Sequence, residues 1–349
     1  MAFKYHEQED KKIHLKLKEM LNELPPFCAA FFRGIEPRTQ SRTRLAYAYD
    51  LTVFFTFIRD TNPLYKNKTL RDIDFSILEQ LKAADIEEYM EYLKYRPGED
   101  GEDIANKESA VKRKISSLKS FYNYFYEREE ITVNPAALVH LPKIKEKEII
   151  RLDYDEVSSL LDEAESGEGL TKRQQEFHKH TKKRDVAMLA LLLGTGMRVS
   201  ECVGIDLNDI DLNETAVNIH RKGGKEETVY FSDEVADMIL PYYEERRTRL
   251  PESGSENALF LSLQNKRISV RSAELMVKKY AKIVTPLKHI TPHKLRSTYG
   301  THLYQETSDI YLVADVLGHS DVNTTKKHYA AIGEERRRLA RSKVKLRED

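Results

Sequence analysis

The sequence is poor in cysteine. Its 349 residues include only Cys28 and Cys202, too few for a disulfide framework and without the paired spacing of a zinc site. Cys202 falls inside a helix-like run, where a cysteine is most simply a small core residue. The scarcity therefore indicates neither a disulfide-stabilised protein nor a cysteine-bound metal.

An excess of charge of one sign and a long apolar run are also missing. Lys and Arg together number 57, as do Asp and Glu, so only local basic stripes can indicate a nucleic-acid partner. No stretch has the length and apolarity of a transmembrane helix, and the polar start MAFKYHEQEDKK predicts no signal peptide. We expect a cytoplasmic protein without a membrane partner.

The first half of the chain predicts helices. Apolar residues recur at helical spacing over residues 7–23, from Thr39 or Ser41 to Asn62, and over 83–95. The inward face of the second of these helices is expected to hold Leu45, Tyr49, Thr52, Phe55 and Ile58. We therefore expect residues 1–140 to form a domain of four or five helices without strands.

A further helix over 105–126 has two contrasting sides. An apolar stripe is formed by Val111, Ile115, Leu118, Tyr122 and Phe125. The other side carries lysines and serines, among them Lys112, Ser116 and Lys119. Such a helix can lie along a DNA groove and contact phosphates. A solvated helix face explains the same pattern, and the sequence leaves both interpretations open.

Turn residues and alternating charges over 141–152 predict a linker, and residues 153–349 then form a second domain. Asp153 and Glu156 have the spacing of a capping box. The basic run over 167–183 contains His178 and His180 but no carboxylate or thiolate at ligand spacing. We expect this run to be a mobile loop rather than a metal site.

Arg198 follows a wholly apolar helix and the turn residues Gly194 and Gly196. Burying an arginine there is costly unless an anion meets it. Glu201, three residues on, lies on the same helical face and can orient the guanidinium, which leaves outer N–H groups for a phosphate. A buried Arg–Glu pair without a ligand fits the same spacing.

Residues 216–221 and 228–231 alternate as strands do, and Gly223-Gly224 suits a hairpin turn between them. Lys222 and Lys225 lie at the tip, positioned to reach a groove, although lysines are common at surface turns. Helices are expected over 235–247 and 272–284. The fold class is therefore mainly α with a small β-sheet, an α+β arrangement.

The segment from Thr291 to Tyr329 holds the densest group of reactive side chains. His293 and Arg296 are three residues apart on a helix that Thr291-Pro292 begins. A second helix ends at Gly318, a left-handed position, and His319 follows it. A third carries Tyr329. Each feature has an ordinary explanation as a salt-bridged pair, a helix cap or amphipathic packing; their joint occurrence favours an active site.

Taken in chain order, these residues resemble the tyrosine site-specific recombinases, the lambda-integrase family. The matching segments are GTGMRVSE, RKGGKEETVYF, TPHKLRSTYGTHLY and LGHSDVNTTKKHY. Within the family the Xer group, in its single-protein type, is the nearest likeness. Two departures are Ser297, where Xer proteins commonly have histidine, and residues 323–328 before the tyrosine. Neither touches the catalytic set.

The resemblance implies a fold and a reaction. A helical core-binding domain would precede a catalytic domain, and Tyr329 would attack a DNA phosphate to form a 3′-phosphotyrosine. Arg198 and Arg296 would bind the non-bridging oxygens, Lys222 would protonate the leaving oxygen, and His293 and His319 would assist, with Glu201 holding Arg198. It implies no metal and no cofactor, because the five cationic or imidazole side chains supply the positive charge.

The resemblance also implies partners. These are a double-stranded DNA recombination site, a dimer of this chain on one site, a tetramer at synapsis, exchange of the C-terminal tail between protomers, and a DNA translocase or accessory protein. Chromosome dimer resolution is the expected role, with a phage or mobile-element integrase as the alternative. A type IB topoisomerase and a non-catalytic DNA-binding protein of the same fold are the other hypotheses.

Overall fold

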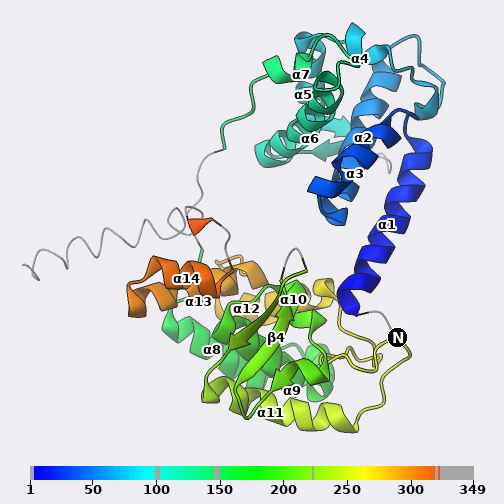
Figure 1. The fold of residues 1–349 in the computed structure, drawn as a ribbon. Coiled ribbons are helices and arrows are strands. Elements are labelled where there is room, and N and C mark those ends of the chain that lie inside the picture. The colour runs from blue at the N-terminus through cyan, green and yellow to red at the C-terminus, as the bar shows by residue number, and fades with distance from the viewer. Residues whose placement is uncertain (1–3, 99–102, 145–149, 222–223, 319–320, 323–349) are drawn as a thin grey trace, which may run out of the picture. The chain divides into compact units, whose positions relative to one another are not determined.

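The computed structural model describes residues 4–98, 103–144, 150–221, 224–318 and 321–322. The chain divides into two units, Met1–Lys147 and Glu148–Asp349 (Figure 1). This division falls inside the linker predicted over 141–152. Within the described residues, no helix combines the length and apolarity that a bilayer crossing needs.

The first unit is built mainly of helices. They are α1 (Tyr5–Glu23), α2 (Cys28–Ile35), α3 (Ser41–Thr61), α4 (Ile77–Gln80), α5 (Ala83–Lys94), α6 (Glu108–Tyr126) and α7 (Pro135–Leu138), with the 3₁₀ turns η1 (Glu36–Arg38) and η2 (Leu70–Asp72). Proline sets two of the boundaries: α1 ends before Pro25, and α7 begins at Pro135, where the missing N–H costs nothing.

An aromatic cluster fills the core of the first unit. Phe27, Phe55, Phe121 and Phe125 meet edge to face or tilted, with ring centroids 5.1–6.3 Å apart. The apolar stripe predicted on α6 is buried along its whole length. On α3, however, Tyr49 is 48% exposed, so its predicted inward position is wrong; Ala48 and Leu51 take the buried positions instead.

The prediction that the first unit lacks strands is also wrong. Tyr95–Pro97 (β1) pairs antiparallel with Asp103–Ala105 (β2). Because residues 103–105 pair as a strand, α6 begins at Glu108 rather than at 105. The sequence pattern missed the hairpin because its strands are three residues long, too short for an alternation to be visible.

The second unit combines helices with one small sheet. The helices are α8 (Tyr154–Ser166), α9 (Lys172–Thr195), α10 (Val199–Gly204), α11 (Asp233–Thr248), α12 (Val270–Val284), α13 (Pro292–Thr307) and α14 (Ile310–Val316), with the turn η3 (Leu207–Asp209). The strands β3 (Ile210–Asp211), β4 (Ala216–His220) and β5 (Glu226–Tyr230) form an antiparallel sheet in that order. The mainly helical fold with small sheets is therefore confirmed.

Helix α9 corrects the expectation of a mobile loop over 167–183. Gly167 ends α8 in the left-handed conformation, and α9 starts at Lys172, with Thr171 and Gln174 forming a capping box. His178 is buried, with Nε2 2.8 Å from the carbonyl oxygen of Ala164, whereas His180 is exposed. Lysine, arginine and glutamine are good helix formers, so polarity alone was a poor indicator of a loop.

A buried carboxylate joins α9 to α12. Asp185 accepts hydrogen bonds from Arg184, Lys279 and the Tyr280 hydroxyl, the last at 2.8 Å. Burial opposes its charge, yet Arg184 and Lys279 hold the pKa of Asp185 below its ordinary value. Cys28 and Cys202 are fully buried, and burial raises the pKa of both thiols, so both are core residues.

Candidate active site

Arg198 lies at the N-cap of α10 and is held by Glu201. One oxygen of the Glu201 carboxylate accepts from the Arg198 backbone N–H at 2.7 Å, and the other accepts from Nη1 at 2.8 Å. The Glu201 side chain is 3% exposed and the Arg198 side chain 35%. Among the described residues, Nη1 is the sole guanidinium nitrogen of Arg198 with a hydrogen bond. The contact predicted from their spacing is present. It fixes the orientation of the Arg198 guanidinium, whose side chain remains partly exposed.

Gly196 makes the approach to Arg198 possible. It ends α9 with φ of 63°, in the left-handed region that favours glycine. A Cβ there would come within 2.5 Å of the Tyr299 ring and 2.9 Å of the Leu317 side chain. The turn therefore packs directly against α13 and the end of α14, which brings Arg198 close to the segment where the other candidate residues lie.

Arg296 occupies the other side of that turn. It is 4% exposed; Nη1 donates to the Gly196 carbonyl at 2.7 Å, and Nη2 donates to the Leu317 carbonyl. His293, one turn earlier on α13, is exposed. The two residues lie three apart on α13, as predicted from the sequence, but Arg296 is buried whereas His293 is at the surface. Arg296 thus joins the α9–α10 turn to the end of α14, a structural contact that the sequence did not predict.

Arg221 is a central residue that sequence reasoning missed. It follows β4 and is buried, and its guanidinium donates to the carbonyls of Val316 and Leu317 at 2.8 and 3.1 Å and to Glu227 at 2.8 Å. Its Nη1 also lies 3.7 Å from the Glu201 carboxylate. A signal was available: alternation puts Arg221 on the same inward side as Val217 and Ile219.

Three residues of the predicted catalytic set, Lys222, His319 and Tyr329, lie outside the described residues. The elements leading to the first two are described. Arg221 immediately precedes Lys222, and Gly318, which precedes His319, has the predicted left-handed conformation with φ of 60°. Lys225, on the hairpin, is 78% exposed and lies 3.9 Å from Glu227.

The lysine side of α6 is partly committed to internal contacts. Lys119 donates to the Val139 carbonyl at 2.7 Å, and the Ser116 hydroxyl donates back to Lys112 at 2.8 Å. Lys114, on the same helix, is buried against Asp50 at 3.0 Å. Lys112 and Lys119 are both half-buried and Ser116 is exposed, so Ser116 is the most accessible of the three.

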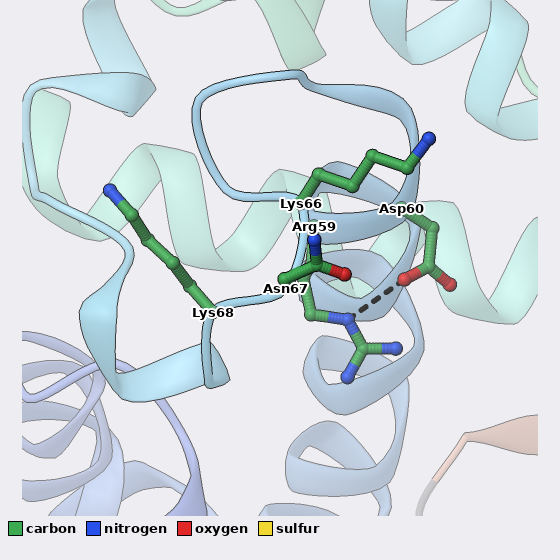
Figure 2. A pocket seen from close by; sticks show the side chains of 5 residues that line it. All are labelled: Arg59, Asp60, Lys66, Asn67 and Lys68. Carbon is green, nitrogen blue, oxygen red and sulfur yellow. Dashed lines mark hydrogen bonds and ion pairs between the residues drawn. The ribbon is translucent and has the colours of Figure 1, made fainter.

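A hollow on the first unit is lined by Arg59, Asp60, Lys66, Asn67 and Lys68 (Figure 2). Arg59 pairs with Asp60 at 2.8 Å, and the ammonium groups of Lys66 and Lys68 point away from one another (Figure 2). Since the cations do not converge, the hollow lacks the geometry of an anion site.

Comparison with known proteins relates both halves of the chain to one family. The sequence model of the Phage integrase family matches residues 150–336. The chain is 32% identical to Tyrosine recombinase XerC of Caldanaerobacter subterraneus, covering 90% of this chain and 86% of the relative. It is 29% identical to Tyrosine recombinase XerS of Lactococcus lactis, covering 92% of this chain and 96% of the relative.

Solved structures show the same fold. The XerH site-specific recombinase in a post-cleavage complex with palindromic difH matches with a TM-score of 0.66 at 17% identity, covering 94% of this chain and 88% of that one. A lambda integrase dimer bound to a core site matches with a TM-score of 0.59 at 17% identity, covering 87% of this chain and 94% of that one.

Proposed function

The chain belongs to the phage integrase family and is a tyrosine recombinase, an enzyme that breaks and rejoins DNA strands, and we propose that Tyr329 forms the covalent bond to DNA. The observation that carries this assignment is the placement of the arginines. Arg198 is fixed by a buried carboxylate with part of its guanidinium exposed, and Arg296 holds the turn that leads to it. Both cations therefore flank one turn, at which Arg198 keeps donors for a phosphate and Arg296 holds the backbone in place.

The proposed reaction is a transesterification at one phosphodiester. The phenol oxygen of Tyr329 forms a bond to phosphorus, the bond from phosphorus to the 5′ oxygen breaks, and the phenolic proton passes to His293 acting as the base on the nucleophile side. Lys222 gives a proton to the departing 5′ oxygen. The product is a 3′-phosphotyrosine and a free 5′-OH, which conserves the phosphodiester and allows rejoining by the reverse step.

The remaining residues stabilise charge or move protons. Arg198 and Arg296 bind the non-bridging oxygens, where negative charge concentrates in the transition state. His293 acts on the nucleophile side as acid or base, which its exposure on the first turn of α13 permits. His319 donates to the phosphate. Glu201 keeps Arg198 in one orientation and keeps its charge paired until DNA binds.

The proposed partners are DNA and further copies of the chain. The helical domain of residues 1–140 and the catalytic domain of 153–349, joined by 141–152, bind duplex DNA, with Lys112, Ser116, Lys119 and Lys225 as candidate contacts. A dimer binds one site, two dimers form a tetramer, and the C-terminal tail passes between protomers. The reaction takes place in the cytoplasm, where such DNA is found.

Chromosome dimer resolution is the proposed role. Xer recombinases that match over nine-tenths of the chain support it. A role in a mobile element is the second candidate, because the family model that matches residues 150–336 is that of the phage integrases. Sequencing the DNA covalently captured from a random pool distinguishes them: a match to a chromosomal site supports the first role, and a match to element ends supports the second.

The test of the reaction is covalent capture on a nicked target duplex selected from that pool. The wild-type protein is expected to form a denaturant-resistant adduct, and Tyr329→Phe none. Tyr311→Phe, which alters an exposed tyrosine on α14, serves as the matched control and keeps the adduct. A plasmid with two directly repeated sites separates a recombinase, which resolves it, from a topoisomerase, which only relaxes it. Absence of any adduct with wild-type protein would overturn the assignment.

A further inference from the structure

We propose that Arg221 is a positioning residue that fixes Arg198 and Arg296 relative to each other, because it shares one partner with each. The inference rests on the proposed function, since it takes those two arginines as the phosphate-binding cations. Arg221 does not itself contact the phosphate. Its role follows from four contacts with three segments that are distant in sequence.

The first shared partner is the Glu201 carboxylate, which accepts a hydrogen bond from Arg198 and forms a longer ion pair with Arg221. Its Oε1 binds Arg198 at 2.8 Å, and its Oε2 lies 3.7 Å from Nη1 of Arg221. Both Arg221 and Glu201 are buried, with side chains 6% and 3% exposed, so their charges interact with little screening by solvent. The carboxylate is thereby held between two guanidiniums, and the direction of Arg198 depends on both.

The second shared partner is the carbonyl of Leu317. It accepts from Nη1 of Arg221 at 3.1 Å and also from Nη2 of Arg296. A carbonyl oxygen has two lone pairs, so it can accept from both guanidiniums at once. Arg221 additionally binds the Val316 carbonyl at 2.8 Å. The C-terminal end of α14 therefore links the cation from α13 to the residue that follows β4.

The surroundings of Arg221 are fitted to this one orientation. Gly318 lies so close that a Cβ there would come within 2.8 Å of the guanidinium carbon. Among the described residues, the Nε of Arg221 is buried without a hydrogen-bond partner, a local cost that the bonds of its two terminal nitrogens offset. A lysine, with one compact ammonium, cannot reach Glu201, Glu227 and both carbonyls together.

The test is a double-mutant cycle on the first-order rate of adduct formation with the nicked duplex. Arg221→Lys is expected to slow cleavage on the order of 100-fold, as misplacement of catalytic groups by about 1 Å does. In an Arg198→Lys background the same change is expected to cost much less, because the group that it positions is already lost. Affinity for the uncut duplex should stay unchanged.

Arg246 provides the matched control. It is also a buried arginine that donates to two backbone carbonyls, those of Ala258 and Glu256, and it has no hydrogen bond or ion pair with Arg198, His293 or Arg296, the proposed catalytic residues that the structure describes. Arg246→Lys is expected to change the rate of adduct formation by the same factor in the wild-type and the Arg198→Lys backgrounds, as a purely structural change does. Thermal unfolding of every variant sets the temperature at which all are folded.

The inference would be overturned if the effects of Arg221→Lys and Arg198→Lys on the rate of adduct formation were additive, as those of Arg246→Lys and Arg198→Lys are expected to be. Should Arg221→Lys not fold, Glu227→Gln weakens one contact of the same guanidinium and enters the same cycle, with a smaller slowing and the same non-additivity expected. Failure of the wild-type protein to form an adduct is a different result, since it removes the proposed function itself.

Discussion

Asp50 in the first unit and Glu201 in the second are both buried carboxylates that meet two cationic side chains. Asp50 accepts from Arg113 through both oxygens at 2.5 and 2.7 Å, from Lys114 at 3.0 Å, and from the Ser117 hydroxyl at 2.7 Å. Both terminal nitrogens of the Arg113 guanidinium bind this one carboxylate. The cluster holds α3 to α6, and its arginine is itself 51% exposed.

Glu201 leaves one of its two cations, Arg198, with fewer side-chain hydrogen bonds. It binds Arg198 through a single side-chain nitrogen, and the Arg198 side chain remains 35% exposed. Its second oxygen binds the Arg198 backbone N–H rather than another guanidinium nitrogen. Exposure does not separate the two pairs, since the Arg113 side chain is 51% exposed and that of Arg198 is 35% exposed. What separates them is the bonding: both terminal nitrogens of Arg113 bind Asp50, whereas one nitrogen of Arg198 binds Glu201, so among the described residues Arg198 keeps more donors for an incoming anion.

The largest expected effect separates the two clusters by stability. Asp50→Asn leaves Lys114, with a side chain 10% exposed, buried without its anion, and should lower the free energy of unfolding by about 3–5 kcal/mol. Denaturant-induced unfolding measures this free energy. Asp60→Asn, at a half-exposed pair with Arg59, should cost under about 1 kcal/mol. Equal losses for both would refute the structural assignment of Asp50.

The next effect separates them by chemistry. Glu201→Gln removes the charge that orients Arg198 and should slow covalent capture on the order of 100-fold, or about 2.7 kcal/mol in the barrier. Asp50→Asn, assayed where it is folded, should cleave at the wild-type rate. Glu245→Gln on α11 removes a carboxylate from Arg249 and serves as control. A wild-type rate for Glu201→Gln would mean that its cluster is structural too.

The smallest effect tests how tightly the Glu201 cluster is packed. Gly318→Ala and Gly254→Ala each place a Cβ at positive φ, 60° and 84°, which costs about 1–2 kcal/mol. Gly254 has open space around it, whereas a Cβ at Gly318 meets Arg221. Only Gly318→Ala should therefore also slow cleavage. Identical cleavage rates would show that Arg221 can move without consequence.

Local spacing predicted much of this site, and long-range contacts account for what it missed. The contact of Arg198 with Glu201 and the left-handed Gly318 follow from residues near each other in sequence. The environment of Lys114 depends on Asp50, 64 positions away, which no local pattern contains.

Polar side chains misled the sequence reasoning in two ways. The basic residues at the start of α9 were predicted to form a loop because the sequence does not show what they pack against. The capping box of Thr171 with Gln174, which is visible in the sequence, indicated a helix instead. Arg221 contacts carbonyls 95 and 96 positions away, and an arginine next to a hairpin turn is by default a surface residue. Tertiary pairing decided both cases.

The joint at Leu317 is made by main-chain atoms. The Leu317 carbonyl binds the guanidiniums of Arg221 and Arg296, and the Val316 carbonyl binds that of Arg221. Any amino acid that replaced either residue would still carry this backbone oxygen. Substitution there alters packing but never deletes the acceptor, so aligned sequences would reveal no pattern for it. An alignment would show Arg221 and Arg296 but not the backbone acceptor that they share, which is visible only in the structure.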